Sequence, residues 1–129
     1  MTFPLPETIT AGTTTGHAAD HVDIHKLLNS TVNTQAGTTY TLVLGDFGKV
    51  IETTSSSSVS VTVPPNSSVA FPIGTVVEIA QLGTGVVTVA QGSGVTINTP
   101  GTLVLRAQYS SVSLRKRGTD LWLLAGDTT

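Results

Sequence analysis

Apolar and polar residues alternate in short stretches from Tyr40 to the end of the chain. The alternation is strict in residues 59–63, where the valines of VSVTV occupy the odd positions, and it returns in residues 85–98. Such a period places every second side chain on one face, as in a half-buried strand. Turn residues, mostly glycine and proline, separate the stretches. We expect strands at 40–44, 49–53, 59–63, 69–71, 75–82, 86–90, 95–98, 102–105, 110–115 and 120–125.

These strands follow one another without a helical pattern between them. Strands at this spacing indicate packed antiparallel sheets or a closed barrel, whereas helices alternating with strands would indicate a parallel sheet. We therefore predict that residues 40–129 form one mainly β domain, an antiparallel β-sandwich or barrel-like module.

The first 16 residues show neither the helical nor the strand period. Their apolar positions are Phe3, Leu5 and Ile9, set among small polar residues and two prolines. Because proline fixes φ and lacks a backbone donor, we expect residues 1–16 to form an extended arm. A docking arm orders when its apolar residues meet a partner groove or a sheet edge, and a frayed terminus is the alternative.

Residues 17–30 carry the one convincing helical pattern, and the polar stretch 31–39 is expected to be a linker. At 100° per residue, one face of this short amphipathic helix carries three histidines together with apolar residues. A helix of about three turns is marginal alone in water, so we expect this face to pack on a partner. The interface candidates of the helix are His17, His21, Ile24, His25, Leu27 and Leu28.

The histidines recur every four residues, a spacing that places imidazoles on one face as in zinc-binding helices. His17 and His25 lie about 12 Å apart along a helix, so all three histidines cannot reach one ion. The HExxH signature is also absent, because Ala-Ala-Asp separates the first two histidines. We expect hydrogen-bonded interface residues with no bound metal or cofactor. A pH-sensitive contact and a metal-dependent enzyme are the alternatives.

Charged residues make up 11% of the chain, the formal net charge is -2, and there is no cysteine. No basic field draws the chain to nucleic acid or to an anionic membrane. Disulfides, thiolate zinc sites and cysteine nucleophiles are excluded. The carboxylates are dispersed without a local pair for acid–base catalysis, so we expect no enzyme. The scarcity of charge favours a surface that meets another protein.

No stretch approaches the roughly 20 apolar residues of a membrane span, and the first residues lack the pattern of a signal peptide. We expect a protein that is made in the cytoplasm and either stays soluble or joins a particle there.

Basic and aromatic residues offer two weaker candidates for binding. In a strand, Arg115 and Arg117 share one face and Lys116 the other, which we interpret as charges that protect a sheet edge. Sugar-binding grooves usually stack rings on aromatic side chains, and Tyr40, Tyr109 and Trp122 are few. Trp122, within DLWLLAG, is expected in the core. A glycan site therefore has little support from the sequence.

Two segments resemble small virion and tail-fibre proteins of tailed bacteriophages. The segment GHAADHVDIHKLLN follows a threonine-rich arm and is similar to a "GH…DH…IH…LN" stretch near the start of such proteins. The segment VTINTPGTLVLRAQYSSVSLRKRGTDLWLLAGD is similar to their terminal β modules, with a "Q-Tyr" strand and a final "W-x-L-x-G" strand.

This resemblance implies a homotrimeric, β-structured virion component whose arm and helix attach to the particle while the β module projects. A capsid decoration or head-fibre protein needs only a short chain, whereas a tail fibre usually has a long shaft. The length therefore favours a decoration protein on the major capsid protein, located on the virion surface and assembled in the host cytoplasm. The alternative is a tail-fibre or receptor-binding tip that recognises the host cell surface.

Overall fold

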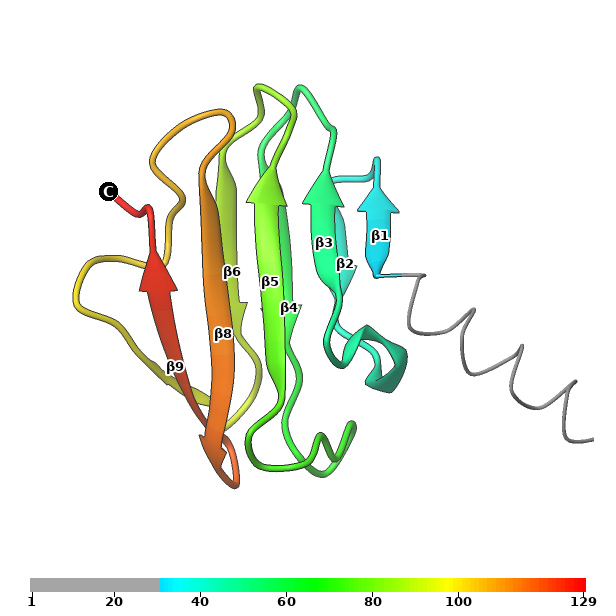
Figure 1. Ribbon diagram of the computed structural model, residues 1–129, viewed down its shortest axis with the longest axis vertical. Coiled ribbons are helices and arrows are strands. Elements are labelled where there is room, and N and C mark those ends of the chain that lie inside the picture. Colours follow the sequence, from blue (N-terminus) through cyan, green and yellow to red (C-terminus); the bar gives the residue numbers. More distant parts are fainter. Residues whose placement is uncertain (1–30) are drawn as a thin grey trace, which may run out of the picture. The chain divides into compact units, whose positions relative to one another are not determined.

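A computed structural model describes residues 31–129 of the chain. The predicted arm (1–16) and the predicted helix (17–30) lie outside the described residues, together with every interface candidate that these segments contain. Residues 32–129 form one unit, and its regular structure is almost entirely β, as the alternating pattern predicts (Figure 1).

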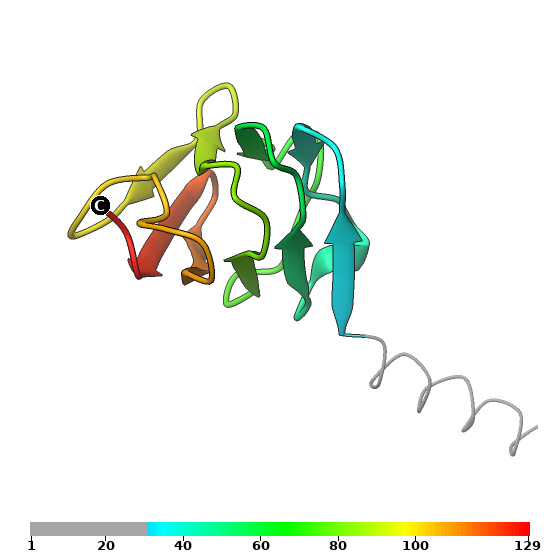
Figure 2. The ribbon, with the colours of Figure 1, turned by 90° about the horizontal axis from the view of Figure 1, so that it is seen from above.

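The first six strands belong alternately to two sheets. The strands of the first sheet are β1 (Val32–Gln35), β3 (Val50–Thr53) and β5 (Val76–Gln81), and those of the second are β2 (Thr39–Thr41), β4 (Val59–Val63) and β6 (Val87–Gln91). Each odd strand and the even strand that follows it make one rung, so three rungs stack in a β-solenoid-like arrangement. Figure 2 shows the two sheets as separate layers.

Each strand of a rung pairs in parallel with the corresponding strand of the next rung. The prediction of an antiparallel sandwich or barrel is therefore wrong for this part of the domain. Parallel neighbours need a crossover connection, which is usually a helix. Here the crossover from one odd strand to the next is made by a strand of the opposite sheet, so parallel pairing arises without any helix between the strands.

The C-terminal third continues the first sheet in mixed directions. It contributes β7 (Thr96–Asn98), β8 (Ser111–Gly118) and β9 (Leu121–Gly126), and the sheet order is β1-β3-β5-β8-β9-β7. β8 is antiparallel to both β5 and β9. Isolated bridges join Thr88 of β6 to Val104 and Leu105 to Thr128, so residues 104–105 lie between the second sheet and the segment after β9.

Three local predictions differ from the structure. The expected linker at 31–39 contains β1 and the start of β2. The expected strand at 69–71 lies in the loop between β4 and β5, and the expected strand at 102–105 makes only isolated bridges. The strand VNTQ was missed because it lacks the valine-rich alternation. It is a strand because it pairs with β3 of the next rung, which the local sequence does not reveal.

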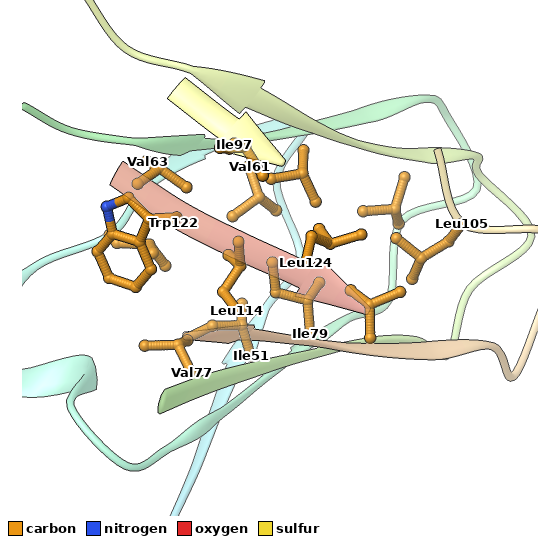
Figure 3. Close-up of a cluster of buried hydrophobic side chains, with 14 of the residues drawn as sticks. Ile51, Val61, Val63, Val77, Ile79, Ile97, Leu105, Leu114, Trp122 and Leu124 are labelled. Carbon is orange, nitrogen blue, oxygen red and sulfur yellow. The ribbon is translucent and has the colours of Figure 1, made fainter. Parts of the chain in front are cut away.

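The core lies between the two sheets and is built from the inward positions of nearly every strand (Figure 3). Ile51 and Ile79 are neighbours in one sheet, and Val61 and Val89 are neighbours in the other. Trp122 is buried, as predicted, and its ring meets Phe71 edge to face with the ring centres 5.6 Å apart.

The turns that join the two strands of one rung also stack closely on those of the next. The backbone N–H of Gly83 donates to the Thr53 carbonyl, and that of Gly85 donates to the Ser55 carbonyl, both at 3.0 Å. A Cβ atom on Gly85 would lie 1.9 Å from the carbonyl oxygen of Ser57. Only glycine permits this approach of one turn to the next.

Candidate interaction surfaces

Two inward positions of the first rung are polar where the aligned positions of the second rung are apolar. Asn33 pairs with Ile51, and Tyr40 pairs with Val61, so each polar residue occupies an inward position of its strand. These two side chains meet each other, with Asn33 Nδ2 donating to the Tyr40 hydroxyl oxygen at 2.9 Å. Asn33 and Tyr40 therefore form a polar layer at this end of the core, in a rung whose buried apolar residue is Leu42.

Asp46 completes this polar layer. Its carboxylate is almost fully buried and accepts hydrogen bonds from Asn33 Nδ2 at 2.8 Å, from the Tyr40 hydroxyl at 2.6 Å and from the backbone N–H of Val43 at 2.9 Å. Burial, followed by the hydrogen bond and negative charge of Asp46, raises the pKa of Tyr40 to about 12. The phenol therefore stays protonated as a donor at neutral pH.

These hydrogen bonds anchor a turn that exposes large apolar side chains. The 3-10 turn η1 (Leu44–Asp46) buries Asp46, while Leu44 and Phe47 on either side of it are exposed by 56% and 58%. Val43 is also exposed. Because the anchor holds the backbone, the turn cannot easily fold these side chains back onto the domain.

A second turn extends the apolar surface. The backbone N–H of Gly48 donates to the Val76 carbonyl at 3.0 Å, which joins the segment after η1 to the start of β5. Val76 and Ile73 are both exposed. Figure 1 places the two turns at the same end of the strands, the end at which β1 begins. We define the apolar turn surface as Val43, Leu44, Phe47, Ile73 and Val76.

The opposite end of the strands carries an exposed tyrosine. Tyr109 lies in the turn before β8, its side chain is 75% exposed, and its φ is 73°. Its backbone N–H donates to the Gln81 carbonyl at 2.6 Å, and Gln108 Nε2 donates to the Leu82 carbonyl at 3.0 Å. These bonds tie the turn to the end of β5.

An ion pair braces the same turn from its other side. Arg106 makes two hydrogen bonds to Asp127, at 2.7 and 2.8 Å, and the Ser110 hydroxyl donates to the same carboxylate at 2.7 Å. Ser110 Oγ also accepts from the backbone N–H of Ala107 at 3.1 Å. The hydrogen bonds from Arg106 and then Ser110 hold the pKa of Asp127 below its usual value. The turn is therefore held at both ends.

The basic cluster is divided as predicted, but its role differs. Arg115 and Arg117 point outward from β8, and Lys116 is buried. β8 lies between β5 and β9, so it is not an edge strand and the prediction of an edge guard is wrong. Lys116 Nζ donates to Asn66 Oδ1 and to the Phe71 carbonyl, which holds the loop between β4 and β5 against the sheet.

The predictions about the three histidines stay predictions. The three histidines lie outside the described residues, and residues 31–129 contain no group of three or more potential metal ligands of the His, Cys, Asp or Glu type. No helix within that same range is long and apolar enough to cross a membrane.

Of the residues in the apolar turn surface and in the turn that carries Tyr109, only Tyr109 was considered from the sequence as a binding residue. Asp46 belongs to a Gly-Asp turn signal, and its burial depends on Asn33 and Tyr40, which are six or more positions away in the chain. Phe47 is the aromatic member of a turn segment, a signal that could have marked it.

Comparisons with protein-family models, with curated proteins and with solved structures find no match to this chain.

Proposed function

We propose that the protein is a structural component of the virion of a tailed bacteriophage, a homotrimeric decoration protein that docks on the major capsid protein. In this proposal the arm and helix dock together with the apolar turn surface, and the β module covers the capsid. The protein has no catalytic role.

The observation that carries the proposal is the braced exposure of the apolar turn surface. Apolar groups gain roughly 25 cal/mol per Å² when they leave water, and part of this gain is offset by association costs. Asp46 anchors the backbone of the turn on which Leu44 and Phe47 are exposed. A surface held in this way is suited to burial against a partner. The apolar turn surface lies at the end of the strands at which β1 begins.

Particle binding by purified variants tests this role. We expect Phe47→Ser to weaken sedimentation with undecorated capsids at least tenfold, because the ring is lost from the buried contact. Tyr109→Ser is the matched control, since it removes an aromatic side chain that is even more exposed from the opposite end and should leave binding unchanged.

Deletion of residues 1–16 provides the second test. We expect this variant to lose particle binding while the β domain still unfolds cooperatively. Retention of binding by both the deletion variant and Phe47→Ser would overturn the docking role. Light scattering of the full chain tests the trimer, and a monomer at micromolar concentration would contradict it.

The second candidate function is a tail-fibre or receptor-binding tip that recognises the host cell surface. The exposed aromatic side chain of Tyr109, far from the apolar turn surface along the strands, favours this candidate. A cell-adsorption assay separates the two functions, because a pure decoration protein should neither bind host cells nor block phage adsorption.

A further inference from the structure

Tyr109 differs from the other two aromatic side chains that the sequence offers for ligand stacking. The hydroxyl of Tyr40 is committed to Asp46, and Trp122 is 1% exposed in the core. Tyr109 has most of its side chain in water. An aromatic ring gains more than most side chains when a ligand covers it, because it presents a large area with few rotatable bonds.

The backbone of Tyr109 is held in a conformation that its side chain disfavours. A φ of 73° lies in the left-handed region, which glycine and asparagine adopt more easily than an aromatic residue. Such strain persists only where the surroundings impose it, and strained residues concentrate at ligand-binding positions. Here the hydrogen bond to Gln81 and the Asp127 brace impose it. The domain therefore accepts a stability cost that keeps the ring in place.

The surroundings of Tyr109 combine apolar and polar side chains, and the charges of its turn are paired with each other. Gln108 and Leu82 are exposed beside it and joined by a hydrogen bond. The stacked turns at this end expose hydroxyl groups, among them those of Ser57 and Thr84. The charges of Arg106 and Asp127 are paired with each other.

We propose that Tyr109 and its neighbours form a binding surface for an uncharged saccharide. The apolar face of a sugar ring would stack on the tyrosine ring, and sugar hydroxyls would exchange hydrogen bonds with Gln108 and the hydroxyls of the stacked turns. A neutral ligand fits because Arg106 and Asp127 neutralise each other and leave no charge there to attract an ionic ligand. The proposal does not depend on the docking role, since the apolar turn surface lies at the other end of the strands.

A glycan array probed with the full-length protein tests the proposal, followed by titration of a bound neutral oligosaccharide. We expect Tyr109→Ala to lower the affinity at least tenfold and Tyr109→Phe to retain it within about threefold. Tyr109→Gly is the informative variant, because it relieves the strained φ while removing the ring. It should lose saccharide binding and yet unfold at a higher temperature than the wild type.

Phe47→Ser should keep saccharide binding whatever its effect on capsids, which separates this site from the docking surface. The proposal is overturned if no neutral glycan binds, or if Tyr109→Ala binds as well as the wild type. It is also overturned if adsorption to host envelopes survives periodate oxidation of their sugars and is lost on protease treatment, because the ligand would then be a protein.

Discussion

The first rung and the two rungs that follow it share one register but differ in what they bury. The inward positions occupied by Ile51 and Val61 in the second rung hold Asn33 and Tyr40 in the first. The second rung has a paired strand on both sides, whereas β1 and β2 each pair on one side only within residues 31–129. A polar interior suits a terminal layer, because its groups bond to one another and to Asp46 rather than exposing apolar core.

This difference explains how one sheet pattern serves two purposes. The covered rungs supply the free energy of burial that holds the domain together. The terminal rung contributes less apolar burial, chiefly Leu42 directly after β2, and its polar groups anchor the turn that exposes Leu44 and Phe47. The covered rungs thus stabilise the domain, and the neighbouring terminal rung holds the turn that exposes apolar side chains.

The strongest test removes apolar volume from a covered rung. We expect Ile79→Ala to lower the free energy of unfolding by about 4 kcal/mol, since Ile79 is fully buried and the cavity is lined by fixed neighbours. Denaturant unfolding followed by circular dichroism measures the loss. Asn33→Ala, at the aligned position of the first rung, should cost clearly less, and equal losses would remove the distinction between the rungs.

The next test concerns the stacking of turns between rungs. Gly85→Ala should cost about 3 kcal/mol, because its Cβ would overlap the Ser57 carbonyl and the turn must move away. Gly45→Ala is the control, since a Cβ there meets no atom within 4 Å. The melting temperatures of both variants should separate them, and a stable Gly85→Ala variant would show that the turns do not stack this closely.

Removal of the anchor of the first rung should have an intermediate effect. Asp46→Ala leaves the donors of Asn33, Tyr40 and Val43 without their acceptor, and we expect a loss of about 2 kcal/mol. Amide exchange should rise locally in residues 43–48 before it rises in the core. Substitution of Glu52, which points outward from β3, should change stability by less than about 0.5 kcal/mol.

The smallest effect is expected at the Tyr40 hydroxyl. Its pKa is raised in the folded state, so its contribution to stability is complete below about pH 10 and is lost as the pH rises toward about 12. Absorbance at 295 nm should therefore show one phenol titrating near pH 12. Tyr40→Phe should remove this late titration and cost about 1 kcal/mol at neutral pH. Titration of every tyrosine near pH 10 would contradict the buried hydrogen bond.

A repeat in the sequence could have revealed the parallel stacking. Ile51 and Ile79 are register partners, and so are Val61 and Val89, each pair 28 positions apart in the chain. The repeat is hard to recognise because only the second and third rungs share this spacing, whereas Asn33 and Tyr40 of the first rung precede their partners by 18 and 21 positions. The first rung hides it further, since its inward residues are polar.

The order of residues alone was enough to locate most strands and many of the side chains that they bury. Alternation identified residues 59–63, separated Lys116 from Arg115 and Arg117, and placed Trp122 in the core, because these features depend only on neighbours along the chain. The tertiary structure alone decided that the rungs pair in parallel, that Asp46 is buried, and that Tyr109 is strained and exposed. Strand direction and partner choice depend on how the chain crosses between the sheets. A two-residue period carries no information about that crossing.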